Sequence, residues 1–379
     1  MEGGAMMRFV LSFLLLLASV SMGAKGDSTT VVHAVAAGVR PAFVTKAASA
    51  HLQYSFAFPE ASALGRMFPT AYQGVGVASY SFFNHDEVGS PAALYVFQGA
   101  TIARLGERLS LDYEWNFGVS AFWKPNADVS TRMNAYINAG LMLSWRPLPS
   151  WKFSAGLDYS HFSNGDTTFP NAGVNTYGAR FTASRSFEGG SASGALADRA
   201  FGARLLGTGL TESGFLSRAS VDVILCGAWY EEMITYRRKE RMVDGKFGVL
   251  ALHVNPLYKV TRFLSVGPSV DVQFNEGINL QDHVAGVNPV TDVMKFHRPP
   301  LSEQLGVGLS ARAELHAPIF SINLGLGHNV IYKGEELGGM YAIIALKTFL
   351  YEGFFLHTGL KVFGSTSSNN LLLGAGWRF

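Results

Sequence analysis

Strict alternation of apolar and polar residues is the feature that most restricts how this chain folds. It is clearest in the segment from Leu109, where one set of alternate positions holds Leu111, Tyr113, Trp115, Phe117, Val119 and Trp123. The intervening positions hold Ser110, Asp112, Glu114, Asn116, Gly118 and Ser120. Successive side chains of a β-strand point to opposite faces, so this pattern predicts a strand with one apolar and one polar face. The aromatic residues near its ends are typical of the girdles that border the lipid-facing band of a membrane barrel.

The composition also favours a membrane barrel over a soluble domain. Hydrophobic residues make up 48% of the 379 residues and charged residues only 15%, below the roughly 25% usual for soluble domains. Beyond the N-terminus, no run of about 18 apolar residues occurs that could cross a bilayer as a helix. In a transmembrane barrel the alternation averages the hydropathy out, which explains both observations. The net charge of +2 says little about partners, but no patch typical of a nucleic-acid site stands out, so we expect no nucleic-acid partner.

Residues 1–24 have the pattern of a secretory signal peptide. Arg8 supplies the positive charge, residues 9–20 form the apolar core, and Ser21 and Gly23 are the small residues expected before a cleavage site. The apolar core is too short to cross a bilayer as a helix. We therefore expect residues 1–24 to be removed on export and residues 25–379 to form a transmembrane β-barrel.

The alternation repeats along the chain and predicts an all-β, antiparallel outer-membrane barrel of about sixteen strands. We place the strands near residues 33–46, 48–59, 71–84, 91–104, 108–123, 134–145, 149–163, 174–188, 218–236, 246–258, 261–275, 304–317, 318–331, 337–350, 352–364 and 369–379. An even number puts both termini in the periplasm, and most of the long connections then lie outside the cell. Residues 60–70 and 189–217 would be long periplasmic connections. The second is rich in Gly, Ser and Ala and is where a strand pair could be miscounted, so twelve or fourteen strands are alternatives.

The chain ends on another amphipathic segment. Its apolar positions are Leu371, Leu373, Ala375, Trp377 and Phe379, and they alternate with Gly374, Gly376 and Arg378. This segment resembles the C-terminal strand by which outer-membrane barrels are recognised for assembly. We therefore expect the barrel-assembly machinery as a partner and the bacterial outer membrane as the location of the protein.

The predicted strand at 151–163 carries two polar residues, His161 and Ser163, at the end of its apolar face. Asn175 lies on the apolar face of the next strand. If residues 161 and 175 pair across the hairpin, their Cβ atoms are about 4.5–5.5 Å apart. The arrangement predicts a triad with Ser163 as nucleophile, His161 as general base and Asn175 as the group that orients the imidazole.

The oxyanion of such a reaction needs hydrogen-bond donors close to the nucleophile. Asn164 and the backbone N–H groups around Gly165 are the nearest candidates. Asn175 can accept the imidazole N–H through its side-chain oxygen, but as a neutral group it stabilises the imidazolium less than a carboxylate does.

A non-catalytic interpretation competes with this one. A histidine at the rim of a barrel is usually an interfacial polar residue, although three polar residues facing lipid around one loop invite a functional explanation. The inward-facing residues Asp112, Glu114, Asp158 and Arg180 form either an interior polar network or the lining of a channel. The second possibility describes a porin or uptake barrel in which His161 and Ser163 are incidental.

The sequence around the predicted triad resembles the lipid A 3-O-deacylase family, also called acyloxyacyl-hydrolase-like. That family has a His-x-Ser-Asn run, matched at 161–164, then Pro-Asn-x-Gly, matched at 170–173, and an acidic triad member fourteen residues after the His. The resemblance implies hydrolysis of an ester-linked acyl chain of lipid A in the outer leaflet, with Ser163 as nucleophile, His161 as base and Asn164 in the oxyanion hole. This chain departs from the family at position 175, which is Asn and not Glu.

The same residues also resemble outer-membrane phospholipase A, which has His-x-Ser-Asn-Gly and an Asn fourteen residues after its His. His161, Ser163, Asn164, Gly165 and Asn175 match that pattern, but the phospholipase has no Pro-Asn-x-Gly element. This resemblance implies a phospholipid substrate and a Ca²⁺ requirement. We expect no cofactor and no metal unless the phospholipase alternative holds.

Two charged loops have both a functional and an ordinary interpretation. Arg237, Arg238, Lys239 and Arg241 either contact lipid A phosphates, which guanidinium groups bind in bidentate fashion, or form a solvated loop. The run 85–87, His-Asp-Glu, either joins a calcium site or is simply a turn. We favour the turn and assign no metal ligand.

Overall fold

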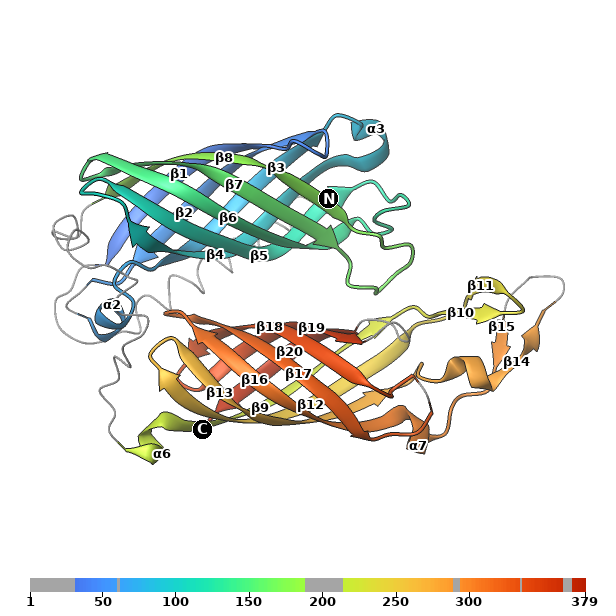
Figure 1. The fold of residues 1–379 in the computed structure, drawn as a ribbon. Helices are drawn as coiled ribbons and strands as arrows, with labels where there is room; N and C mark the ends of the chain where they lie inside the picture. Colours follow the sequence, from blue (N-terminus) through green and yellow to red (C-terminus); the bar gives the residue numbers. More distant parts are fainter. Residues whose placement is uncertain (1–30, 60–61, 188–213, 289–293, 335, 364–369) are drawn as a thin grey trace. The chain divides into compact units, whose positions relative to one another are not determined.

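The computed structural model describes residues 31–59, 62–187, 214–288, 294–334, 336–363 and 370–379. The predicted signal peptide at 1–24 lies outside these residues. The strands close into two separate antiparallel barrels, one drawn in blue to green and the other in yellow to red in Figure 1. The chain also divides into two compact units that correspond closely to the barrels.

The first barrel consists of the first eight strands in chain order. They are β1 (Val32–Pro41), β2 (Ala47–Ala57), β3 (Tyr72–Phe82), β4 (Gly89–Arg104), β5 (Leu109–Trp123), β6 (Met133–Leu148), β7 (Trp151–Ser163) and β8 (Val174–Phe187). Each strand pairs with the next, and β1 pairs with β8 to close the barrel. Two short helices, α2 (Ala63–Met67) and α3 (His85–Val88), lie in its connections.

The second barrel also has eight strands. They are β9 (Ala219–Tyr230), β12 (Phe247–Thr261), β13 (Leu264–Asn275), β16 (Leu305–His316), β17 (Phe320–Ile331), β18 (Met340–Tyr351), β19 (Phe354–Phe363) and β20 (Asn370–Arg378). The pair β9–β20 closes the barrel. Its connections hold the hairpins β10 (Met233–Tyr236)–β11 (Lys239–Met242) and β14 (Val284–Val287)–β15 (Met294–Phe296), and the short helices α6 (Phe215–Arg218), η1 (Leu280–His283) and α7 (Leu301–Gln304).

The prediction of sixteen barrel strands is confirmed, but their closure differs from the single barrel that we expected. Strand β8 pairs with β1 and not with β9. Alternation identifies strands and their two faces, whereas closure depends on a pairing between strands far apart in the sequence. The predicted strand 218–236 also ends earlier, at Tyr230, and the loop that follows contains the hairpin β10–β11. Among the described residues, no helix is long and apolar enough to cross a membrane.

Within β5, the alternation breaks near the end of the strand. Phe122 has a φ of +71° and is exposed, so Trp123 turns inward and is only 2% exposed. There the Trp123 Nε1 donates to Ser120 Oγ at 2.8 Å. The prediction that Trp123 lies on the apolar face was therefore wrong, because one residue in the left-handed conformation shifts the alternation by one position.

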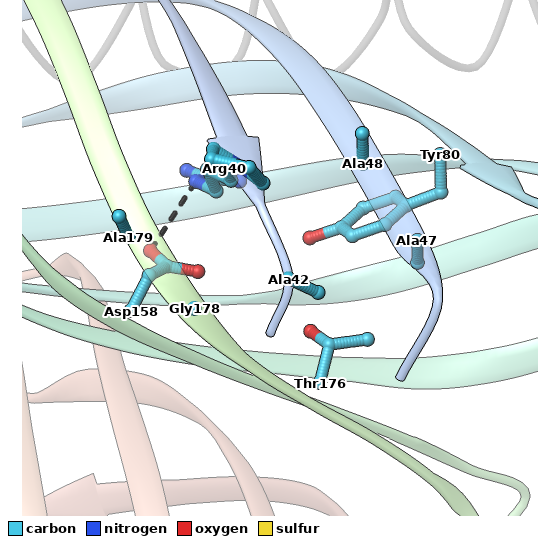
Figure 2. Close-up of a pocket in the computed structure, with 10 residues that line it drawn as sticks. Arg40, Ala42, Ala47, Ala48, Tyr80, Asp158, Thr176, Gly178 and Ala179 are labelled. Carbon is cyan, nitrogen blue, oxygen red and sulfur yellow. Dashed lines mark ion pairs between the residues drawn. The ribbon is translucent and has the colours of Figure 1, made fainter. Parts of the chain in front are cut away.

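The interior of the first barrel is a buried network of charged side chains. Arg40 Nε lies 3.4 Å from Asp158 Oδ1, as Figure 2 shows, and Arg180 pairs with Glu114. Beside Arg40 and Asp158 is a cavity of only about 10 Å³, enough for one water molecule. An eight-stranded barrel is just wide enough for its interior to be filled by side chains. The predicted interior network is therefore present, and it occupies the space that a channel would need.

The second barrel has its own interior network. Lys347 Nζ lies 2.6 Å from Asp222 Oδ2 and also pairs with Glu314. Arg378 joins both carboxylates, with Nε and Nη2 each 2.7 Å from an oxygen of Asp222. Since Asp222 is on β9 and Arg378 on β20, this ion pair joins the two strands that close the barrel.

Candidate active site

The hairpin β7–β8 brings the histidine and the asparagine of the predicted triad together. Its register pairs His161 with Asn175, and His161 Nδ1 lies 2.8 Å from Asn175 Oδ1. An amide oxygen only accepts hydrogen bonds, so Nδ1 carries the proton and donates it. The lone pair is then on Nε2, which is the arrangement that a general base requires.

Ser163 lies two residues beyond His161 on the same strand. Residues two apart in a strand share a face, so Ser163, His161 and Asn175 are all on the outward face of the first barrel, and all three are half-buried. The apolar side chains nearest to them on this face are exposed, and they include Met133, Ile137 and Tyr177. A lipid chain would therefore meet the three polar residues beside an apolar wall.

The Pro-Asn-x-Gly element at 170–173 shapes the loop next to this site. The side-chain Oδ1 of Asn171 accepts a hydrogen bond from the backbone N–H of Asn164 at 3.0 Å. Gly173 has a φ of +75°, and a Cβ there would lie 3.0 Å from His161 Cε1 and 3.6 Å from Ser163 Cβ. The loop thus passes so close to the histidine and the serine that position 173 needs a glycine. The motif is visible in the sequence, but neither of these two roles was predicted from it.

The two oxyanion-hole candidates are in the loop after β7. Asn164 is only 7% exposed, and its side-chain Nδ2 donates to Ser130 Oγ at 3.2 Å. The backbone N–H of Asn164 already donates to Asn171, so the side-chain amide of Asn164 is the better candidate to donate to an oxyanion. Gly165 follows directly, with a φ of +66°.

Tyr159, which is not one of the residues predicted for the triad, also belongs to the site. Its hydroxyl donates to Asn175 Oδ1 at 2.8 Å, so this oxygen accepts hydrogen bonds from both His161 and Tyr159. The only signal in the sequence was its place on the outward face, two residues before His161.

An aromatic cluster inside the barrel supports the end of β7. Phe162, between His161 and Ser163, turns inward and is fully buried. Its ring centroid lies 4.9 Å from that of Trp123, 5.0 Å from Tyr80 and 5.2 Å from Tyr136. Packing of this kind fixes the backbone that carries the two outward-facing residues, as a preorganised site requires.

The basic residues that we considered as lipid-phosphate contacts belong to the second barrel. Arg237 and Arg238 form the exposed tip of the hairpin β10–β11, Lys239 and Arg241 follow on β11, and Arg241 is half-buried. The structure therefore does not place them in the barrel that carries His161 and Ser163.

The run 85–87 forms most of helix α3. Across the described ranges, no group of three or more His, Cys, Asp or Glu side chains is arranged to hold a metal ion.

Apolar outer walls, charged interiors and closed antiparallel sheets define the chain as an outer-membrane β-barrel protein. Residues 46–184, in the first barrel, match the family model described as lipid A 3-O-deacylase (PagL). Residues 219–379, the second barrel, match the model described as acyloxyacyl hydrolase, C-terminal domain. The chain belongs to the lipid A 3-O-deacylase (PagL) family.

Solved structures give weaker similarities. Neisserial surface protein A matches with 12% identity and a TM-score of 0.28, over 43% of this chain and 98% of that protein. The Acinetobacter baumannii outer membrane protein Omp33 matches with 7% identity and a TM-score of 0.19, over 93% of this chain and all of that protein. No curated protein matches the chain. Similarities at this level carry no argument about activity.

Proposed function

We propose that the first barrel hydrolyses an ester-linked acyl chain of lipid A, with Ser163, His161 and Asn175 as its catalytic residues. The observation that carries the proposal is the 2.8 Å hydrogen bond between His161 Nδ1 and Asn175 Oδ1 on the outward face of the barrel. It leaves Nε2 as the basic nitrogen, on the face that holds Ser163. The lipid A 3-O-deacylase model over residues 46–184 supports the choice of substrate.

In the reaction, His161 Nε2 takes the proton of the Ser163 hydroxyl while Oγ attacks the ester carbonyl carbon. The tetrahedral intermediate collapses, the bond to the lipid oxygen breaks, and this oxygen receives the proton from His161. A water molecule, deprotonated by His161, then attacks the acyl-enzyme. The products are a free carboxylic acid and a lipid that has lost one acyl chain.

The negative charge that develops on the carbonyl oxygen needs donors beside Ser163. We assign this role to the side-chain amide of Asn164 and to the backbone N–H of Gly165. Asn175 stabilises the imidazolium less than a carboxylate does, because an amide carries no net charge. We therefore expect a slower enzyme than one with an acidic residue at position 175.

The site lies at the end of the first barrel opposite the end where β1 starts and β8 finishes. In a barrel with an even number of strands, the two chain ends lie on the periplasmic side. The site then borders the outer leaflet, where it meets lipid A. Within the second barrel, Arg237, Arg238, Lys239 and Arg241 form a basic hairpin that would bind lipid phosphates on its own account. Strand β20, with Phe379 directly after it, would be recognised by the barrel-assembly machinery.

The deciding experiment is mass spectrometry of outer-membrane lipids from cells that express the wild type or Ser163→Ala. Lipid A lighter by one acyl chain in the wild type alone supports the proposal. Accumulation of lysophospholipids with unchanged lipid A would instead establish the phospholipase alternative and lead to a test for Ca²⁺. If neither lipid changes and a conductance survives in Ser163→Ala, the protein is a pore and the enzyme proposal is wrong.

A further inference from the structure

An asparagine in place of an acidic triad residue creates an ambiguity that a carboxylate does not have. Both oxygens of a carboxylate accept hydrogen bonds, whereas an amide presents an oxygen on one side and an NH₂ group on the other. If Asn175 turned its NH₂ toward His161, Nδ1 would have to accept. The ring proton would then be on Nε2, and His161 could not take the proton of Ser163.

The hydroxyl of Tyr159 resolves this ambiguity. It donates to Asn175 Oδ1 at 2.8 Å, and the same oxygen accepts from His161 Nδ1 at 2.8 Å. An amide oxygen has two lone pairs and satisfies both donors. With the amide reversed, both His161 and Tyr159 would face an NH₂ group. The phenol oxygen would then have to accept from this group, with its own proton turned away from Asn175 toward Tyr177, so the hydrogen bond that Tyr159 donates to Asn175 would be lost.

The surrounding strands hold Tyr159 in this position. Its register partner on β8 is Tyr177, and the two ring centroids are 4.9 Å apart. Tyr159, His161 and Ser163 follow one another at every second position of β7, so they share the outward face. The phenol therefore lies beside Asn175 on the side away from the loop.

We propose that Tyr159 is a positioning residue, which fixes the orientation of the Asn175 amide and through it the tautomer of His161. The inference rests on the proposed role of His161 as general base. It explains how a triad with a neutral third member keeps its base in the active form. Tyr159 touches no reacting atom and acts only through Asn175.

The test combines Tyr159→Phe and Asn175→Asp, singly and together. In the Asn175 protein, Tyr159→Phe should lower kcat about tenfold, the order expected when one net hydrogen bond that selects the amide orientation is lost. In Asn175→Asp the same change should cost less than about threefold, because either carboxylate oxygen accepts from His161. Tyr113→Phe is the matched control, since Tyr113 is an outward-facing phenol hydrogen-bonded to Gln98 in the same barrel.

The tautomer itself is measured by ¹⁵N NMR of histidine-labelled protein, with the His161 signal assigned from its loss in His161→Gln. The wild type should show the proton on Nδ1, Tyr159→Phe should show a mixture, and Tyr159→Phe with Asn175→Asp should restore the Nδ1 form. An unchanged tautomer in Tyr159→Phe, or an equal loss of kcat in both backgrounds, would overturn the inference. Because this signal needs no substrate, a Tyr159-dependent tautomer in a protein inactive on lipid A would support the positioning role while refuting the proposed function.

Discussion

Replacement of Gly173 by Ala tests how tightly the loop after β7 is built against the histidine and the serine. Gly173 has a φ of +75°, and an added Cβ would lie 3.0 Å from His161 Cε1 and 3.1 Å from the backbone oxygen of Phe162. The backbone oxygen is held in the sheet, so either the imidazole or the loop must move by a few tenths of an ångström. We expect Gly173→Ala to lower kcat while the barrel remains folded.

The expected magnitude follows from two separate costs. A non-glycine residue in the left-handed region costs about 1–2 kcal/mol, which reduces the stability of the loop. A displacement of 1 Å in a catalytic group can cost roughly 100-fold in rate, so a few tenths of an ångström should cost about three- to tenfold in kcat. The effect on kcat should thus be larger than any effect on the unfolding of the whole barrel.

Gly245→Ala separates these two costs. Gly245 has a φ of +109°, but a Cβ there would meet nothing within 4 Å. Gly245→Ala therefore places a non-glycine residue at a positive φ, as Gly173→Ala does, but without bringing a Cβ against a neighbouring side chain. The assay measures release of fatty acid from lipid A in detergent micelles, with denaturant unfolding of each variant alongside. Full kcat in Gly173→Ala, or an equal loss in Gly245→Ala, would refute the reasoning.

Three further predictions concern the triad and the stability of each barrel. Ser163→Ala and His161→Ala should each abolish release of fatty acid, whereas Asn175→Ala should keep some activity. The fatty-acid assay measures all three variants, and full activity in Ser163→Ala would rule out the proposed mechanism. Phe162→Ala should destabilise the first barrel by about 3–5 kcal/mol, since it removes a fully buried ring from the aromatic cluster, and denaturant unfolding measures this loss. Arg378→Ala should destabilise the second barrel by about 3–5 kcal/mol, because it removes a partner from two fully buried carboxylates. Folded barrels migrate differently from unfolded ones on a gel, and the temperature at which this shift is lost should be lower in Arg378→Ala than in the wild type. An unchanged temperature would contradict the prediction.

The strands were predictable because each one separates two different environments. In β7, the exposed Phe153 and Leu157 alternate with the buried Ser154 and Asp158. The two environments therefore appear in the sequence as an alternation of apolar and polar residues. Closure was not predictable in the same way. The pairing of β1 with β8 depends on strand tilt and barrel diameter, and no local pattern distinguishes two barrels of eight strands from one of sixteen.

For the candidate site, alternation predicted which side chains share a face but not what they touch. Side-chain direction follows from position in a strand, so His161, Ser163 and Asn175 could be placed together from the sequence. The roles of Tyr159 and Gly173 depend on rotamers and on the path of the loop. Neither a side-chain rotamer nor the path of a loop follows a periodic pattern in the sequence.

The separate closure of the two barrels limits how the second barrel could contribute to catalysis. Because β8 pairs with β1, the first barrel has no open edge for the second to complete. The proposed triad, its aromatic support and its charged interior all come from residues 32–187. The second barrel is closed by β9 and β20 and is stabilised by an ion-pair network of its own around Asp222. Loss of that network in Arg378→Ala should therefore leave both the orientation of His161 and the kcat of lipid A hydrolysis unchanged, and a changed His161 tautomer would contradict this separation.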